Sequence, residues 1–448
     1  MQILTSYRLE SGALPEEEAI ACADSVCKLI EEWLNKKGAK NLSSEGGTFD
    51  SMTPSAKGTF ARRKFASESG VVEQIVLQEP TKSQQLFTTS IFLITEPRNV
   101  CVFATLSLKS AEASIAPVSA HPRCPNFIQE ILRLRSSWHF GDTLLPSPNV
   151  LRMNGRERGL ALAANIIDPN RTLPVVVISE IEEEPVWADL PEKLALDLAG
   201  LAFVARVDEE ASWALTDQLG KTLSCYLGAV RLYWPTTSQS VSAAASRSRV
   251  WTASSLLSND TDGKSATKFR SALRRTVMSV AALTLEPPPS IRRIHAEVSR
   301  ARIASLKARA TEYSEELELA RLYAEENEEL REQLEEARKD LARQTARADA
   351  AEFALEQAKA PSEEAEITEG TEHTTPVSGE TRFYKKIHSK PSHDVLVQIS
   401  DCGHNYWQSA NKADKAKKGI ERLEHSNDWK RLSHCGKCQG GGVWKVEW

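Results

Sequence analysis

The chain has 448 residues, a net charge of -5 and eight cysteines. A single hydrophobic core rarely extends beyond about 250–300 residues, so this length predicts several domains. The nearly balanced charge argues against a uniformly basic nucleic-acid-binding protein. A hydrophobic content of 41% is slightly low for a compact protein, which indicates that part of the chain lies outside any core.

The sequence shows no sign of export or membrane insertion. Its N-terminal residues lack the basic leader and apolar core of a secretory signal. No window holds the roughly 18 uninterrupted apolar residues that a membrane-spanning helix needs. We therefore expect a soluble, cytoplasmic protein with no membrane contact. Five cysteines lie singly among apolar neighbours, as expected of buried free thiols.

Residues 1–240 are predicted to form a mixed α/β domain. A helix is expected to begin at Pro15, where acidic residues follow, and to end at Gly38. The segments 86–94 and 100–106 indicate a β-hairpin because turn-forming residues separate them. The apolar run LPVVVI at 173–178 is typical of a strand buried on both faces. Further strand-like runs, alternating with helical patterns, occur at 71–77, 201–207 and 229–234.

Residues 241–290 are expected to contain a linker and a helix. The Ser/Thr/Ala-rich stretch 236–266 has little to bury in a core. A helix is predicted over 267–284, and it must end before the three consecutive prolines that begin at Pro287.

Residues 291–360 carry the pattern of a coiled coil. The segment has no Gly or Pro, and its apolar residues recur at alternating spacings of three and four, with one slip in phase near 320–330. As one helix it would form a rod on the order of 100 Å long. Asn327 falls at an a position, where a buried Asn commonly fixes the register of two parallel helices. We expect this segment to dimerise the chain. A solvated helix or an antiparallel hairpin within one chain is the alternative, and the orientation of the paired helices is open.

The last part of the chain has two blocks of opposite charge. Residues 361–380 hold six acids and no Lys or Arg, which is typical of an acidic disordered linker. Residues 381–448, the C-terminal module, hold 13 Lys and Arg against seven Asp and Glu, a net charge of +6. The small overall charge therefore hides a strong asymmetry along the chain.

The C-terminal module is predicted to be a small α+β domain of β-α-β order. Val395, Val397 and Ile399 alternate as on one face of a strand. A helical stripe is expected to contain Trp407, Ala410, Ala413, Ile420 and Leu423. Trp444, Val446 and Trp448 share one face of a final strand. A unit of this size buries little surface and often needs a covalent or metal staple.

Three cysteines and a histidine in the module have the spacing of a metal site. Cys435 and Cys438 are separated by two residues, a spacing that lets a turn direct both sulfurs at one ion. Cys402 and His404 would complete a Cys₃His site for Zn²⁺. His434 is a competing ligand for the position of His404. A redox-active cysteine pair or plain reduced thiols are the alternatives.

The module also interleaves basic residues with aromatic ones. Such a surface can neutralise phosphates and stack on bases, so it indicates binding to nucleic acid or to an acidic protein. The alternative is that the basic residues lie on an ordinary solvent-exposed helix face and the tryptophans belong to the core. The basic residues in question are Lys385, Lys386, Lys412, Lys415, Lys418, Lys430 and Arg431.

Enzyme motifs are weak throughout the chain. The segments 215–222 and 258–265 both end in Gly-Lys-Thr or Gly-Lys-Ser, but both lack the first Gly of a phosphate-binding loop. Four glutamates within 180–184 follow a predicted strand and could hold Mg²⁺. They also fit an ordinary solvated loop. Asp189 and Arg231 are weak candidates of the same kind. His121 and Cys124 would suit a base and a thiol, but the sequence shows no partner for them.

Together these patterns predict a multidomain protein with a mixed α/β N-terminal domain, a long coiled-coil helix and a small C-terminal module with a zinc site. Its expected function is that of a coiled-coil oligomer that presents the basic module to nucleic acid or to an acidic partner. One alternative is an enzyme, such as a divalent-metal phosphoesterase or nuclease, with an active site in residues 1–240. Another is a scaffold that binds protein only.

Overall fold

The computed structural model describes most of the chain and divides it into two compact units. One contains Met1–Arg63, Gln74–Leu285 and Thr375–Trp448, and the other contains Lys64–Glu73 and Glu286–Thr374. The described residues are 2–39, 45–50, 57–81, 85–110, 122–236, 247–258, 264–309, 376–410, 413–438, 442–448, and helical residues between 318 and 341. Residues 361–375 of the linker predicted at 361–380, together with Lys412 and His121, lie outside them.

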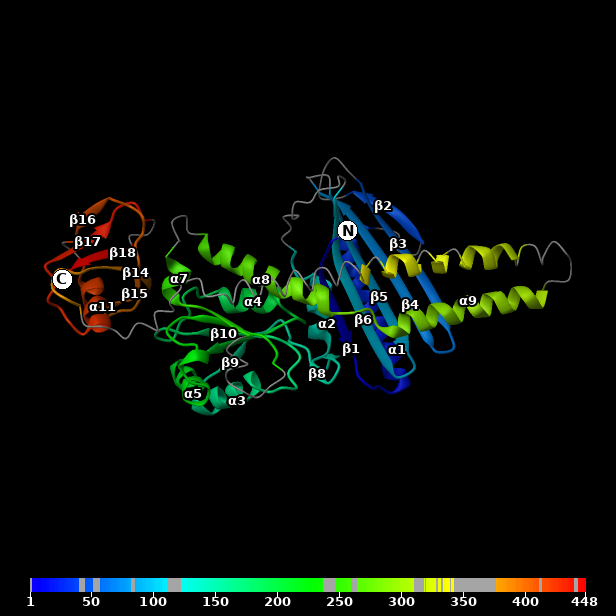
Figure 1. The fold of residues 1–448 in the computed structure, drawn as a ribbon, viewed down its shortest axis with the longest axis horizontal. Helices are drawn as coiled ribbons and strands as arrows, with labels where there is room; N and C mark the ends of the chain where they lie inside the picture. Colours follow the sequence, from blue (N-terminus) through cyan, green and yellow to red (C-terminus); the bar gives the residue numbers. More distant parts are fainter. Residues whose placement is uncertain are drawn as a thin grey trace. The chain divides into compact units, whose positions relative to one another are not determined.

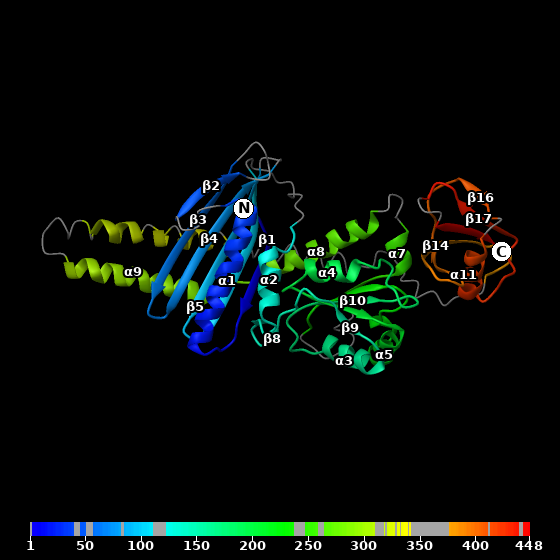
Figure 2. The same ribbon diagram turned by 180° about the vertical axis from the view of Figure 1, so that it is seen from behind.

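An eight-stranded sheet begins the fold, and α1 (Glu16–Lys37) and α2 (Asn126–Leu134) lie on it (Figures 1 and 2). The hairpin predicted at 86–106 is confirmed, because β5 and β6 pair antiparallel along their whole length. The strands in spatial order are β2 (Gly46–Asp50), β3 (Lys57–Ser67), β4 (Gly70–Pro80), β5 (Gln85–Glu96), β6 (Asn99–Ser110), β1 (Gln2–Glu10), β7 (His139–Phe140) and β8 (Thr143–Leu144).

Helix α1 shows how the sequence sets these elements. Three glutamates occupy its first turn and two lysines its last, which complements the helix dipole. Gly38 ends it in the left-handed region at φ 98°, and its N–H donates to the carbonyl of Asn35. The apolar stripe of α1, with Val26 and Ile30 fully buried, packs into the core that the sheet provides.

A second sheet of five strands has helices on both faces. Helices α3 (Arg156–Ile166) and α5 (Glu209–Leu219) cover one face, and α4 (Leu190–Asp197) and α8 (Ser265–Thr284) cover the other. The predicted strand buried on both faces is β10, whose five residues are all buried. The strands in order are β13 (Ser248–Trp251), β12 (Val230–Tyr233), β10 (Val175–Ser179), β11 (Phe203–Val207) and β9 (Leu151–Met153). A short turn, η1 (Lys221–Leu223), follows α5, and α7 (Ala253–Leu257) follows β13.

A buried ion-pair cluster joins α4 to α8. Asp197 accepts from Arg270 at 2.5 Å and from Arg274 at 2.9 Å. The side chains of Asp197 and Arg274 are almost fully buried, so Arg274 needs the carboxylate of Asp197 for charge compensation.

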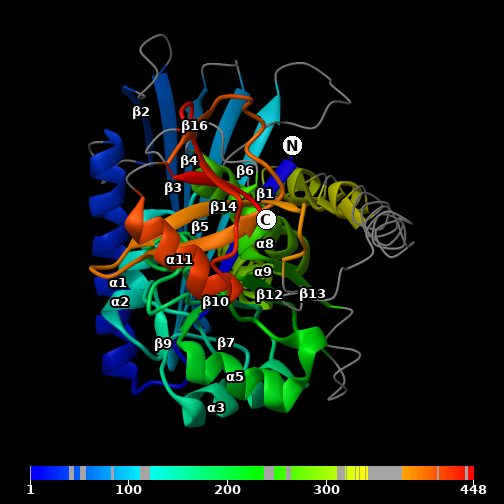
Figure 3. The same ribbon diagram turned by 90° about the vertical axis from the view of Figure 1, so that its left-hand side faces the viewer.

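The C-terminal module is a five-stranded antiparallel sheet with one helix, α11 (Asp414–Glu424), across one face (Figure 3). The strands in order are β15 (Asp394–Ile399), β14 (Thr381–Ser389), β18 (Val443–Glu447), β17 (Arg431–Cys435) and β16 (Trp407–Ser409). The expected β-α-β order was therefore too simple. Trp407 was assigned to the helix but lies in β16, where it pairs with Cys435. Its spacing from Ala410 and Ala413 fits a helix, but the ladder to β17 decides its conformation.

The core between the module's sheet and α11 contains a buried acid. Glu424 accepts from the Arg382 guanidinium at 2.6 Å and from the Tyr384 hydroxyl at 2.8 Å. Its side chain is 1% exposed, so the helix and β14 are joined by a fully desolvated carboxylate. Trp444, Val446 and Trp448 pack in the same cluster, as their shared strand face predicted.

The second unit corrects the prediction of one long rod. Helix α9 (Pro289–Arg309) has 21 residues, and no helix in the described part of the chain exceeds the 22 of α1. Glu329 acts electrostatically on His295, although 34 residues of continuous helix would separate them by about 51 Å. The helical residues between 318 and 341 therefore fold back beside α9 (Figure 1). Spacing alone did not reveal this reversal, because spacings of three and four recur in both arms and a slip in phase also occurs in continuous coiled coils. Residues 342–360 of the predicted coiled coil lie outside the described residues.

Helix α9 has described contacts with the 64–73 segment of its own unit. The His295 ring lies 4.1 Å from the ring of Phe65, and Ser69 donates to Glu297 at 2.5 Å. Among the residues that the structure describes, no helix is long and apolar enough to cross a membrane.

Candidate metal centre

Four side chains predicted as metal ligands come together in the C-terminal module. Cys402 and His404 lie in the loop between β15 and β16, and Cys435 ends β17 with Cys438 just beyond it. Their ligand atoms all lie within 4.8 Å of one another. We name Cys402, His404, Cys435 and Cys438 the Cys/His cluster. It could hold a metal ion, and it is the only such group of three or more His, Cys, Asp or Glu found within the described residues.

The distances within the cluster fit tetrahedral coordination. His404 Nδ1 lies 3.7 Å from the sulfur of Cys435 and 3.5 Å from that of Cys438. Around a tetrahedral ion with ordinary zinc bond lengths, sulfur and nitrogen ligands lie about 3.5 Å apart and two sulfurs about 3.8 Å apart. The two distances from His404 are therefore close to those of a four-coordinate site.

Two glycines allow the ligand loops to adopt this geometry. Gly403, between two ligands, has φ 70°, a conformation that L side chains rarely adopt. Gly436 donates its N–H to the carbonyl of Tyr406 at 3.0 Å, and a Cβ there would lie 2.6 Å from the Tyr406 ring. The 435–438 turn thus packs closely against the Tyr406 ring, which would have to move if residue 436 carried a side chain.

The surroundings of the three thiols favour a negative charge on one of them, Cys435. Burial opposes ionisation of Cys435, but hydrogen bonds from the backbone of Lys437 and Cys438 and from the other two thiols hold its pKa below the usual value. Burial and the hydrogen bond to Cys435 raise the pKa of Cys438 to about 12. Burial likewise raises the pKa of Cys402, against a backbone hydrogen bond from His404. One sulfur is thus prepared to carry charge, and a metal cation would displace the protons from the others.

His434, the competing ligand, is not part of the cluster. Its ring lies 5.8 Å from that of Trp444 instead. His434 and Cys435 are neighbours in β17, so their side chains point to opposite faces of the sheet. This alternation was readable in the sequence once a strand was assigned there.

The predicted nucleic-acid-binding residues occupy several elements of the module. Lys385 and Lys386 lie in β14, and Lys415 and Lys418 are exposed on α11. Lys430 and Arg431 are exposed at the start of β17, where Lys430 contacts the Ser378 hydroxyl at 3.3 Å. They are therefore not gathered on a single element.

Two of the four glutamates at 180–184 contact basic side chains, and the other two are exposed. Glu180 pairs with Arg206 at 2.5 Å, and Glu182 pairs with His393 of the module at 2.9 Å. No metal-binding group forms from 180–184 within the described residues. No observation therefore favours the phosphoesterase alternative.

The other residues singled out in the sequence have structural contacts. Asp189 pairs with Lys193 one helical turn away. Arg231 donates to the Ser224 carbonyl and the Ser248 hydroxyl. Burial raises the pKa of Cys124 to about 12, so this thiol is poorly suited to act as a nucleophile. The 215–222 segment continues α5 into η1, without the strand that precedes a phosphate-binding loop.

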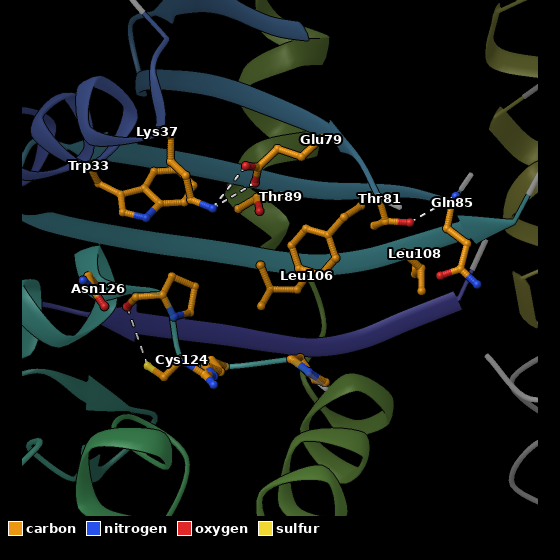
Figure 4. Close-up of a pocket in the computed structure, with 14 residues that line it drawn as sticks. Trp33, Lys37, Glu79, Thr81, Gln85, Thr89, Leu106, Leu108, Cys124 and Asn126 are labelled. Atoms are coloured by element: carbon orange, nitrogen blue, oxygen red, sulfur yellow. Dashed lines mark hydrogen bonds and ion pairs between the residues drawn. The ribbon is translucent and has the colours of Figure 1, made fainter. Parts of the chain in front are cut away.

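A separate cavity of about 500 Å³ lies between α1 and the large sheet (Figure 4). The Lys37 ammonium points at Glu79, 3.1 Å away, and lies 5.9 Å from the Trp33 ring. Leu106 and Leu108 also line the cavity. The sequence carried no signal for this cavity, because its residues come from separate segments of the chain.

No protein-family model matches the chain, and no curated protein or solved structure is detectably similar to it.

Proposed function

We propose that the protein is a non-enzymatic interaction protein whose C-terminal module is stabilised by one Zn²⁺ in the Cys/His cluster. The convergence of four ligand atoms within 4.8 Å carries this proposal. Three sulfurs and one imidazole form a closed set, which is typical of structural rather than catalytic zinc. Soft thiolate ligands favour Zn²⁺ over Mg²⁺ or Ca²⁺, which prefer oxygen.

Elemental analysis of the full-length protein tests the metal. We expect one zinc per chain, and a Cys435→Ser variant should retain much less after dialysis because its buried sulfur is lost. Cys22→Ser is a matched control, since Cys22 is a half-buried thiol on α1, outside the cluster. Wild-type protein purified without chelators and found to hold well under one zinc per chain would contradict the proposal.

The proposed partner of the module is nucleic acid or an acidic protein. Lys415 and Lys418 are exposed one helical turn apart on α11, which supports an electrostatic contact. We expect the full-length protein to retard a labelled oligonucleotide at low salt, and Lys415→Glu/Lys418→Glu to weaken this retardation. Lys28→Glu/Lys36→Glu, on exposed positions of α1, changes the net charge equally and should have a smaller effect. Equal loss in both double variants would show that only total charge matters.

Self-association through residues 291–360 is proposed on a separate observation. Leu330, Leu334 and Leu341 are all more than half exposed in the single chain. Leu334 and Leu341 fall at predicted a positions, so a second copy of the chain could cover them. Light scattering should give twice the chain mass of 49.6 kDa. In the Leu334→Glu/Leu341→Glu variant, the measured mass should fall toward that of a single chain. A monomeric wild-type protein at micromolar concentration would contradict this part.

A further inference from the structure

Residue Glu182 connects the metal-binding module to the five-stranded α/β sheet region. Its carboxylate lies 2.9 Å from His393 Nε2 and 3.3 Å from Lys390 Nζ, and Arg422 Nη2 is 3.8 Å away. All three basic groups belong to the module. His393 is almost fully buried, and its other ring nitrogen contacts the Ser392 hydroxyl at 2.9 Å. The contact is therefore a directed one rather than a loose surface pairing.

The backbone that presents Glu182 is strained. Glu182 has φ 47° and Glu183 φ 74°, so two consecutive non-glycine residues occupy the left-handed region. This conformation is unfavourable for residues that carry a Cβ. An isolated antiparallel β-bridge pairs Ile181 with Glu184 and closes the turn. The Glu183 carbonyl accepts a hydrogen bond from Arg206 at 2.8 Å. Strain of this kind persists where surrounding contacts over-determine it, and it commonly marks a functional position.

Apolar residues around the same turn pack against the face of the module that carries the cluster. Ile181 and Val186 on one side meet Val395, Ile399 and Val443 on the other in one buried core. Two residues of α7, Ala253 and Leu257, belong to the same core. So do the cluster cysteines Cys402 and Cys435. Two of the four metal ligands thus belong to the same buried core as the residues that dock.

We propose that metal binding by the Cys/His cluster is coupled to docking of the C-terminal module on the 181–187 segment and α7 of the same chain. This inference rests on the proposed metal site. Without a metal, the loops that hold Cys402 and Cys435 lose the ion that fixes their shape, so the docking face loses its fit. Docking in turn holds both sulfurs in place. By thermodynamic linkage, the two processes strengthen each other by the same factor.

The test measures both sides of this linkage in the full-length protein. Zinc affinity is measured by competition with a chromophoric chelator, and docking by hydrogen exchange of the amides at 181–187. Zinc removal should speed exchange at 181–187, and Glu182→Ala should weaken zinc binding by a similar factor, about 5- to 150-fold. Glu183→Gln is the control, because its exposed side chain neighbours Glu182 in the same strained turn.

Variants on the module side keep the test decisive if Glu182→Ala disturbs the turn itself. Lys390→Ala and Arg422→Ala leave residues 181–187 unchanged and should each weaken zinc binding in the same direction. If zinc binds at one per chain but neither its removal nor these variants have the expected effect, the coupling is refuted and the metal site stands. If no zinc binds at all, the proposed metal site fails, and the coupling fails with it.

Discussion

Replacing Glu424 by Gln should loosen the C-terminal module without changing its shape. The carboxylate lies within 2.6 Å of Arg382 and 2.8 Å of the Tyr384 hydroxyl, in a site from which water is excluded. Burial and the nearby Glu424 charge raise the pKa of Tyr384, so its hydroxyl stays a donor. Gln keeps the size of the side chain but removes the negative charge from both contacts.

The structure sets the size of the effect. A hydrogen bond to a charged group contributes about 1.5–3 kcal/mol, and breaking a buried ion pair costs about 3–5 kcal/mol. Arg382 keeps a second partner, because Glu380 accepts two of its N–H groups at 2.8 and 3.0 Å. Between these two values, we therefore expect the free energy of local opening to fall by about 2–3 kcal/mol. Exchange of the α11 amides should then quicken about 30- to 150-fold.

Hydrogen exchange followed by mass spectrometry can resolve α11 from the rest of the chain. Glu421→Gln is the matched control, since Glu421 is exposed on the same helix and undergoes the same chemical change. The control should alter exchange less than threefold. An equally small effect of Glu424→Gln would refute the argument that this buried carboxylate holds α11 to β14.

Three further predictions concern the rest of the first unit. Asp197→Asn should lower the free energy of unfolding in urea by about 3–5 kcal/mol, because buried Arg274 loses its counter-charge. The control is Asp217→Asn, which breaks an exposed pair with Arg156 and should cost less than about 1 kcal/mol. Burial raises the pKa of Cys225 to about 12, so its contribution to stability is present below pH 9 and is lost as the pH rises toward 12. Between pH 9 and 10, wild-type protein should therefore lose about 1 kcal/mol more than Cys225→Ala, and equal slopes in urea titrations would contradict this. Gly38→Ala should lower stability by about 1 kcal/mol, because φ 98° suits only Gly and an added Cβ would lie 3.3 Å from the Asp50 carbonyl oxygen; an unchanged urea midpoint would argue against this helix cap.

The sequence was most informative where local chemistry determines structure. The bounds of α1 follow from its acidic first turn, its apolar stripe and Gly38, and all three are local signals. The LPVVVI run was read correctly because a strand with helices on both faces has no polar side to display. The Cys/His cluster was predicted because few residue types ligate soft metals and their spacing constrains the turn.

The features that the sequence did not reveal depend on long-range contacts. Strand β1 was missed because polar residues such as Thr5 and Ser6 are buried in it, so it shows no alternation of apolar and polar residues. The reversal beside α9 was not predicted from the spacing of apolar residues, because spacings of three and four recur in both helical arms. Glu182 looked like part of a solvated acidic loop, and its partners in the module lie more than 200 positions away.

The contact between the 181–187 segment and the module also has a consequence for the order of synthesis. A ribosome adds about 5–20 residues per second, so the last strand of the module leaves it some 13–50 s after residue 187. Until then, Ile181 and Val186 have no module to cover them. The nascent chain thus passes through a stage in which an otherwise folded α/β region carries an open apolar patch. Chaperones that bind exposed apolar surface would be expected to bind the chain during that interval.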